Sequence, residues 1–228
     1  MRDRMERSAK TVIVACSSLR EYVAEAQRQA GTDHPVYWLD RTFHRDPNEM
    51  REHVDRLLHG LPEETQTVLV VMGFCGGSWD GISAPCRMVL PKIDDCVSLL
   101  LQTGDTPKSD LKEPKHLYVR AYDPAEESFR AIFERLTADR DEETKKRFRD
   151  DWKRYYDRIS IIDTGINDCR RPGYYETVRR DAEWLDAKTE YVTGGIHLIT
   201  KLLKGEWDAQ FLVLEPGECV VRERMLIE

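Results

Sequence analysis

The feature of this 228-residue sequence that most restricts its fold is an alternation of short apolar runs with longer amphipathic segments. The apolar runs are rich in β-branched residues, which is typical of buried strands. They occupy residues 11–15, 35–39, 67–72, 87–91, 116–121, 158–163, 189–193 and 211–214. Helical segments are predicted at 17–30, 46–58, 96–101, 123–138, 141–156, 174–187 and 196–203. The alternation predicts an α/β fold with a mostly parallel sheet and helices on both faces.

The length of the chain fits one large α/β domain over residues 1–228, and a division into two lobes is compatible with it. We place these lobes at about 10–115 and 116–220 and expect each to be Rossmann-like. Residues 103–115 are polar and contain Gly, Pro and Lys, so they are predicted to form an exposed loop. The sequence contains no internal repeat.

The composition narrows the classes of partner. A formal net charge of −7 and a pI near 5.5 argue against a general nucleic-acid-binding protein, because phosphate contacts need a basic face. The longest apolar runs, such as 67–74, are far shorter than the roughly 20 residues that span a bilayer. The first ten residues lack the apolar core of a signal peptide. We therefore expect a soluble, cytoplasmic protein without nucleic-acid or membrane partners, and the aromatic face of 141–156 suggests a homodimer.

Reactive side chains follow the first four predicted strands. Cys16, Cys75 and Cys96 come after the first, third and fourth strands, and His44 comes after the second. Ligands of parallel sheets bind beyond the carboxyl ends of the strands, so these side chains are expected at one edge. Thiolates and imidazole are the ligands that Zn²⁺ prefers, and iron–sulfur clusters also use cysteine. The pattern predicts a metal site, with zinc first and an iron–sulfur cluster as the alternative.

Two other interpretations of the same pattern stay open. The cysteines could be small residues that fill helix starts and the core, since isolated cysteines without a CxxC pair are often buried apolar residues. One of them could instead be a metal-free nucleophile, because a helix N-terminus lowers a thiol pKa. In the metal interpretation Asp95 would orient one of the ligands by a hydrogen bond without itself binding the metal.

The glycine-rich turn around Cys75 contains Gly73, Gly76 and Gly77. Such a turn can face a phosphate with its backbone N–H groups, which makes these glycines candidates for cofactor binding. The turn lacks both the GxGxxG and the GxxxxGK[ST] spacing, so the glycines could instead allow close packing around Cys75. Glu218, in the turn that ends the last strand, is a more distant acid/base candidate, and turn chemistry is its alternative role.

Several motifs together carry a resemblance to a known family. In chain order they are Ala15-Cys16 with Leu19-Arg20-Glu21, Phe43-His44 before Pro47, Gly73-Phe74-Cys75-Gly76, Pro91 with Asp95-Cys96, Asp163-Thr164-Gly165, the leucine-rich 198–203, Gly205 with Trp207-Asp208, and Pro216-Gly217. Over about residues 10–220 the chain resembles an uncharacterised prokaryotic domain-of-unknown-function family. Its members often lie near genes for corrinoid-dependent methyltransferases. At the third cysteine the family usually has the sequence His-Asp-Cys. This chain has Asp94-Asp95-Cys96, so Asp94 stands in place of the histidine.

The resemblance implies the site formed by Cys16, His44, Cys75 and Cys96 and an association with one-carbon metabolism, but no defined reaction. We expect a metal-binding protein whose partner is a small-molecule substrate or a corrinoid protein, and an enzyme of methyl or thiol transfer is one form that it could take. An iron–sulfur redox protein is one alternative. A non-enzymatic partner that delivers a metal or binds a corrinoid protein through 141–156 is another. The last is a small-molecule-binding domain whose cysteines are core residues.

Overall fold

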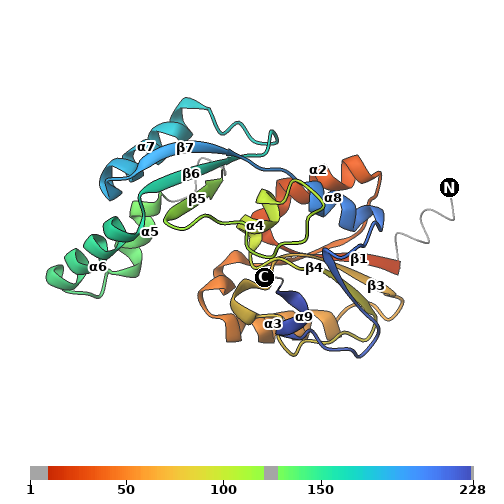
Figure 1. Ribbon diagram of the computed structural model, residues 1–228. Helices are drawn as coiled ribbons and strands as arrows, with labels where there is room; N and C mark the ends of the chain where they lie inside the picture. The colour runs from red at the N-terminus through yellow and green to blue at the C-terminus, as the bar shows by residue number, and fades with distance from the viewer. Residues whose placement is uncertain (1–9, 121–127, 227–228) are drawn as a thin grey trace. The chain divides into compact units, whose positions relative to one another are not determined.

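A computed structural model describes residues 10–120 and 128–226, apart from the side chain of Arg45 (Figure 1). These residues form two compact units. The first unit contains the described residues up to Leu111 and those from Ile196 onward, and the second is Lys112–Gly195. The boundary at Leu111 lies close to the lobe boundary expected at about 115. Residues 196–220, which were assigned to the second lobe, fall in the first unit.

The first unit is built on a five-stranded sheet with the order β2-β1-β3-β4-β8. Its strands are β1 (Thr11–Cys16), β2 (Val36–Leu39), β3 (Thr67–Val71), β4 (Arg87–Pro91) and β8 (Phe211–Leu214). The first four strands are mutually parallel, and β8 pairs antiparallel with β4 at the edge. The predicted α/β fold with a mostly parallel sheet is thereby confirmed.

Helices cover both faces of this sheet. They are η1 (Ser17–Leu19), α2 (Arg20–Ala30), η2 (Arg41–Arg45), α3 (Pro47–His59), η3 (Cys75–Gly77), α4 (Cys96–Leu101), α8 (His197–Lys204) and α9 (Arg222–Met225). In Figure 1, α2 and α8 lie above the sheet, and α3 and α9 lie below it. Cover on both faces explains why β1 and β3 are continuous apolar runs, since both sides of each strand are buried.

Local signals in the sequence set the ends of these helices. The Asp46 side chain accepts a hydrogen bond from Asn48 N at 2.9 Å, and Pro47 occupies the first helical position, so α3 begins there. Gly31 adopts a left-handed conformation (φ 66°) and ends α2. The short helices η2 and α9 were not predicted, because single helical turns have too few residues for a periodic pattern.

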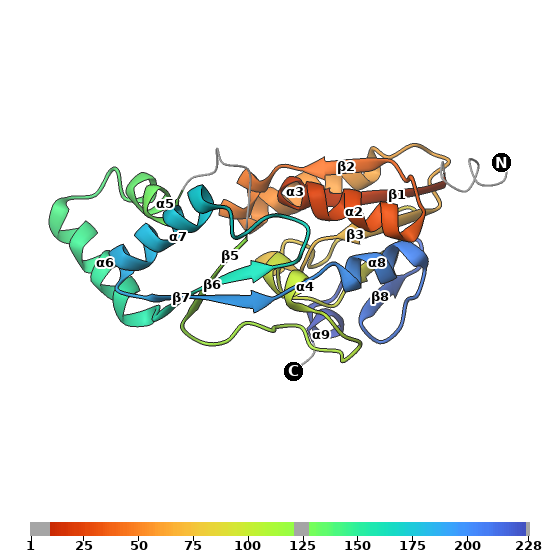
Figure 2. The same cartoon turned by 90° about the horizontal axis from the view of Figure 1, so that it is seen from above.

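The second unit is a three-stranded parallel sheet with the order β5-β6-β7. Figure 2 shows these strands with the helices of the unit. The elements are β5 (His116–Arg120), α5 (Phe129–Leu136), α6 (Glu142–Tyr155), β6 (Arg158–Asp163), α7 (Pro172–Leu185) and β7 (Lys188–Thr193). The part of the predicted helix 123–138 that falls on 123–127 lies outside the described residues. The core of the second unit is centred on Ile159, Ile161, Val178 and Leu185.

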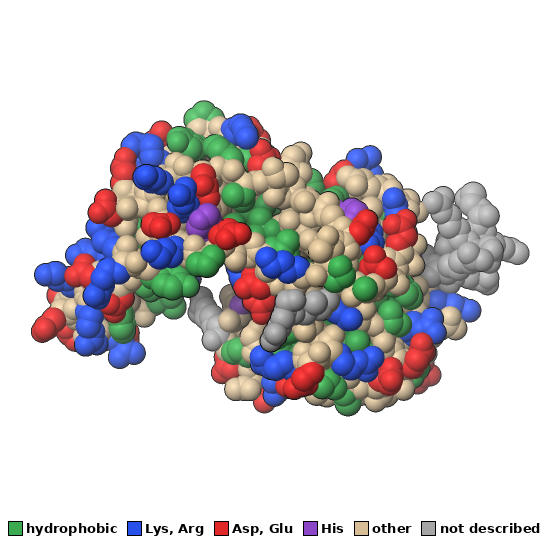
Figure 3. All heavy atoms as spheres, in the orientation of Figure 1, with side chains coloured by type: hydrophobic (Ala, Val, Ile, Leu, Met, Phe, Trp, Pro, Cys, Tyr) green, Lys and Arg blue, Asp and Glu red, His purple; other side chains and the backbone are tan. Residues whose placement is uncertain are grey.

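The surface of the second unit is charged but mixed in sign. Figure 3 shows acidic and basic side chains interspersed over the region of α6, and this helix contains no buried residue. Phe148 and Tyr155 are exposed, at 38% and 59%. Across the described part of the chain, every helix is either too short or too polar to cross a lipid bilayer.

Candidate functional site

The carboxyl ends of the four parallel strands bring the predicted site residues to one edge of the sheet, which we call the thiol edge. Cys16 is the last residue of β1, and His44 lies in η2, directly after β2. Cys75 begins η3 after β3, and Cys96 begins α4 after β4. Because β1 to β4 run in the same direction, all four junctions lie at this edge.

Cys16 and His44 are in direct contact. The Cys16 Sγ atom lies 3.3 Å from His44 Nε2 and 3.0 Å from Ser18 Oγ. Cys16 is only 1% exposed, whereas His44 is exposed on its short helix. This thiol–imidazole contact joins two residues that are 28 positions apart in the chain. The role of Ser18 was not predicted, and its only signal in the sequence is its place two residues after Cys16.

Cys75 has an unusual backbone and an unusual environment. Its φ angle is +49°, in the left-handed region that residues with a side chain seldom adopt. Burial raises the pKa of the Cys75 thiol well above its usual value, and the negative charges of Cys96, Asp95 and Cys16 raise it further. The thiol is therefore neutral near pH 7 in the metal-free chain. Cys16 and Cys96 lie at the same edge of the sheet as Cys75, because β1, β3 and β4 are parallel.

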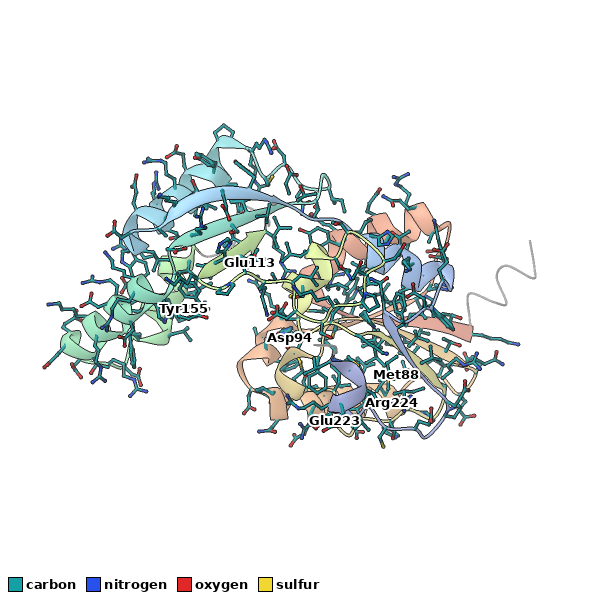
Figure 4. The ribbon with its side chains drawn as sticks, viewed as in Figure 1. Met88, Asp94, Glu113, Tyr155, Glu223 and Arg224 are labelled. Carbon is teal, nitrogen blue, oxygen red and sulfur yellow. The ribbon has the colours of Figure 1, made fainter. Side chains whose placement is uncertain are left out.

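The turn after β3 and the turn after β4 are held together through their backbones. Phe74 N donates to Ile93 O at 2.8 Å, and Cys75 N donates to Asp94 O at 2.7 Å. A Cβ atom at Gly73 would lie 2.5 Å from the Cα atom of Asp95, so only glycine fits there. Asp94, which is labelled in Figure 4, lies in the turn between β4 and α4. These contacts fix the Cys75 and Cys96 junctions beside each other.

Asp95 and the other glycines have clear structural roles. Asp95 Oδ1 accepts hydrogen bonds from Val97 N (3.0 Å) and Ser98 N (2.9 Å), which caps α4. Gly76 and Gly77 have φ angles of +71° and +96°, which side-chain-bearing residues seldom adopt. These geometries match the close-packing interpretation of the turn, and the capping by Asp95 fixes the start of the helix that carries Cys96.

In the structure described, the side chains of the four candidate ligands are not arranged around one position that a metal ion could occupy. Among residues 10–120 and 128–226, no group of three or more His, Cys, Asp or Glu side chains has an arrangement that could hold a metal ion. What the structure gives is one direct contact, Cys16 with His44, and two further thiols at the same edge. A metal at this site requires side-chain rotation from the positions described.

Glu218 is not brought to the thiol edge. Because β8 runs antiparallel to β4, the residues after Leu214 lie beside the amino end of β4, at the opposite edge of the sheet. There Glu215 pairs with Arg87, the first residue of β4, at 3.1 Å. Glu218 accepts a hydrogen bond from Glu215 N at 2.8 Å and so serves the turn. The direction of β8 is what the apolar pattern of this strand could not predict.

The remaining cysteines and the hollow near α8 show no reactive arrangement. Cys86 and Cys169 are buried, and Cys219 is exposed. An open hollow is lined by Asp105, His197, Lys201, Glu206, Trp207 and Asp208. Lys201 donates to Asp105 (2.6 Å), Asp208 (2.7 Å) and Gln210 (2.7 Å), so its hydrogen-bond donors are satisfied. This cluster stabilises the fold around α8.

Comparison with known proteins identifies a family and no closer relative. The model of the family described as "Protein of unknown function (DUF1638)" matches residues 38–203, so the chain belongs to this family. The match includes His44, Cys75 and Cys96 and begins after Cys16. No curated protein and no solved structure matches the chain. The resemblance to a domain-of-unknown-function family is confirmed, and its association with corrinoid methyltransferases stays a prediction.

Proposed function

We propose that this member of the DUF1638 family binds one metal ion, with zinc as the first choice, at the thiol edge. Cys16, His44, Cys75 and Cys96 would be the ligands. The proposal is supported above all by the parallel topology, which collects these four residues at one edge from four separate junctions. Three thiolates and one imidazole are a common ligand set for tetrahedral zinc.

The electrostatics of Cys75 also support a cation at this edge. A thiol whose pKa is raised by burial and by negative neighbours is costly to ionise without a positive partner. A divalent ion would offset the charges of Cys16, Cys75 and Cys96 and would displace their protons. Metal binding should therefore release protons, which can be measured from the pH change of a weakly buffered solution.

His44 is the ligand best suited to exchange with a substrate, because it is exposed on the short helix η2. We propose that a substrate thiol takes its place, and that the metal supplies the chemistry of lowering the pKa of that thiol. In a methyl transfer, the substrate sulfur forms a bond to the methyl carbon while the bond from carbon to the donor breaks. The electron pair of that bond stays with the donor, and the thiol proton leaves to solvent. A corrinoid protein as donor follows from the family resemblance.

A second candidate function rests on the 3.3 Å contact of Cys16 with His44. An imidazole this close can take the thiol proton and leave a thiolate nucleophile without any metal. This candidate predicts that iodoacetamide alkylates Cys16 at neutral pH faster than Cys86 and Cys169, the other buried thiols. It also predicts that His44→Ala slows the alkylation while Cys75→Ser does not.

The test of the metal site is elemental analysis of protein purified without oxygen, together with its ultraviolet–visible spectrum. We expect about one zinc per chain, with loss in Cys75→Ser and Cys96→Ser. Cys219→Ser is the matched control, because it removes an exposed thiol that lies outside the thiol edge. Thermal unfolding of every variant, with and without chelator, separates loss of ligand from loss of fold.

Each outcome of this test decides between the candidates. Iron with sulfide-dependent visible absorbance would replace zinc by an iron–sulfur cluster at the same residues. Metal that is retained in both Cys75→Ser and Cys96→Ser would contradict the proposed ligands. A folded, metal-free protein that also fails to take up added zinc would overturn the proposal and leave the Cys16–His44 nucleophile.

A further inference from the structure

Two arginine side chains from distant parts of the chain reach the glycine turn that carries Cys75. Arg51, on α3, donates from Nη2 to the carbonyl oxygen of Gly77 at 2.9 Å. Arg222, at the start of α9, lies with its guanidinium over the Phe74 ring, 5.0 Å from the ring centroid. A Cβ atom on Gly77 would lie 3.0 Å from Arg222 Nη2, so glycine is what lets this side chain approach.

The part of the chain that the structure describes supplies neither guanidinium group with a carboxylate partner. Within the described residues, Arg51 and Arg222 form no ion pair with a carboxylate, although the chain carries more acidic than basic residues. The Arg51 Nε atom is buried without a hydrogen-bond acceptor in the same set. The nearby Asp80 carboxylate accepts from the backbone N–H of Arg222 at 3.2 Å, and no ion pair joins it to the guanidinium. Two guanidinium groups are thus collected at Phe74 and Gly77, on either side of Cys75 in the chain.

We propose that Arg222, with the charge of Arg51 behind it, binds a carboxylate or similar oxyanion group of the substrate. The planar guanidinium can donate two parallel hydrogen bonds to a carboxylate. Cys75 begins the turn that both arginines contact, so a short ligand held by Arg222 would present its other end to the thiol edge. This inference rests on the proposed function and adds to it a substrate class, a small molecule with an anionic group a few atoms from a thiol.

A purely structural role for the two arginines makes a different prediction. If Arg222 only covers the Phe74 ring and Arg51 only holds Gly77, then anionic and neutral thiols of similar size should bind equally well. The glutamine variant of Arg222 would then change stability and leave ligand preference unchanged. The preference between a charged and a neutral thiol is therefore the deciding measurement.

The experiment uses the full chain with cobalt in place of zinc, because bound thiolates change the visible spectrum of cobalt. We would titrate 3-mercaptopropionate and 1-propanethiol into the wild type, Arg222→Gln, Arg51→Gln and Arg224→Gln. Arg224→Gln is the matched control. Arg224 lies on the same short helix α9 as Arg222, and its replacement removes one positive charge, as Arg222→Gln does (Figure 4). A second titration, with propionate and metal-free protein followed by ligand-detected NMR, reports anion binding without the metal.

We expect the wild type and Arg224→Gln to bind 3-mercaptopropionate about tenfold more tightly than 1-propanethiol, as one charge-assisted contact would give. Arg222→Gln should remove that preference, and Arg51→Gln should reduce it. Equal affinities for the two thiols in cobalt-loaded wild type would overturn the inference and leave the metal site intact. If no cobalt binds, propionate binding that is lost in Arg222→Gln upholds the arginine site while the proposed function fails. If the protein binds neither cobalt nor propionate, both the proposed metal site and the arginine site are overturned.

Discussion

The two compact units use the same alternation of strand and helix but differ in what their strand ends carry. In the first unit, β1, β3 and β4 are almost wholly buried; Cys16 is the last residue of β1, and Cys75 and Cys96 come after β3 and β4. In the second unit only β6 is buried along most of its length, and β7 is largely half-exposed. Parallel topology therefore provides an edge in both units, and the residue types decide whether that edge can do chemistry.

The end of β6 in the second unit is occupied by contacts within the unit. Asp163, the last residue of β6, pairs with Arg170 at 2.8 Å and accepts from Gly165 N at 3.2 Å. Cys169 is 3% exposed, and burial raises its thiol pKa. A carboxylate held by an arginine and a buried neutral thiol are structural features. The proposed chemistry therefore concerns the first unit, where Cys16, Cys75 and Cys96 lie at the ends of parallel strands.

The largest expected effect comes from truncating a central aromatic in each unit. Trp79 in the first unit and Phe133 in the second are 0% and 4% exposed. Replacing either with alanine should cost about 3–5 kcal/mol of unfolding free energy, from lost burial and a cavity. Trp79→Ala should also lower metal content, because Trp79 follows the turn that carries Cys75. Urea unfolding and elemental analysis of both variants make the measurement, and equal metal loss in Phe133→Ala would break the division between units.

The sequence predicted the eight strands and the thiol edge because each depends on local patterns. Apolar runs located the strands, and Asp46-Pro47 located α3. The position of Cys16, His44, Cys75 and Cys96 directly after strands was enough to place them at one edge once the strands were parallel. The distance of Glu218 from the thiol edge follows from the direction of β8, which depends on its pairing with β4 and leaves no local signal. Arg51 and Arg222 were missed because long-range packing brings them to Gly77.

A smaller effect is expected from adding one methyl group at a glycine of each unit. In Gly73→Ala the new Cβ would meet the Asp95 backbone at 2.5–2.7 Å, and a backbone neighbour has little freedom to move. This overpacking should cost roughly 1–3 kcal/mol and weaken metal binding by separating the Cys75 and Cys96 junctions. Gly173→Ala, in α7, is the control, since nothing lies within 4 Å of its Cβ and alanine favours a helix.

Thermal unfolding and cobalt titration of the two glycine variants check this pair. We expect the melting temperature to fall in Gly73→Ala and to stay level or rise in Gly173→Ala. Unchanged cobalt affinity in Gly73→Ala would mean that the contact between the two turns does not set the site. That result would leave close packing as the whole reason for the glycine.

Loss of the N-terminal cap of α4 should lower the unfolding free energy by about 1 kcal/mol. Asp95→Ala removes the acceptor for Val97 N and Ser98 N, so the first turn of the helix that carries Cys96 should loosen. Asp95→Asn keeps an acceptor oxygen and should recover most of the stability. Cobalt affinity measured for both variants distinguishes the cap from the charge. If the asparagine variant binds cobalt as weakly as alanine, the Asp95 charge itself contributes to the site.

The smallest expected effect concerns the pH dependence of the unfolding free energy of the metal-free protein. A buried group in each unit should contribute to it with opposite sign. Burial lowers the pKa of His34 below 6.5 in the first unit, so the unfolded chain binds the proton more tightly there. The His34 contribution to the unfolding free energy is fully present above pH 6.5 and is lost as pH falls toward the folded pKa. In the second unit burial raises the pKa of Asp181 above 3.8, although Phe129 N and Arg130 N donate to its carboxylate.

For Asp181 the sign is reversed, because the folded chain holds the proton more tightly than the unfolded chain. Its contribution is fully present below pH 3.8 and is lost as pH rises through the folded pKa. Urea unfolding between about pH 3.5 and 7.5, followed for wild type, His34→Asn and Asp181→Asn, should show each slope disappear with its own substitution. If both substitutions altered the slope in the same direction, burial would not be the cause in one of the two units. The opposite slopes would show that each unit contributes its own buried ionisable group to the stability of one chain.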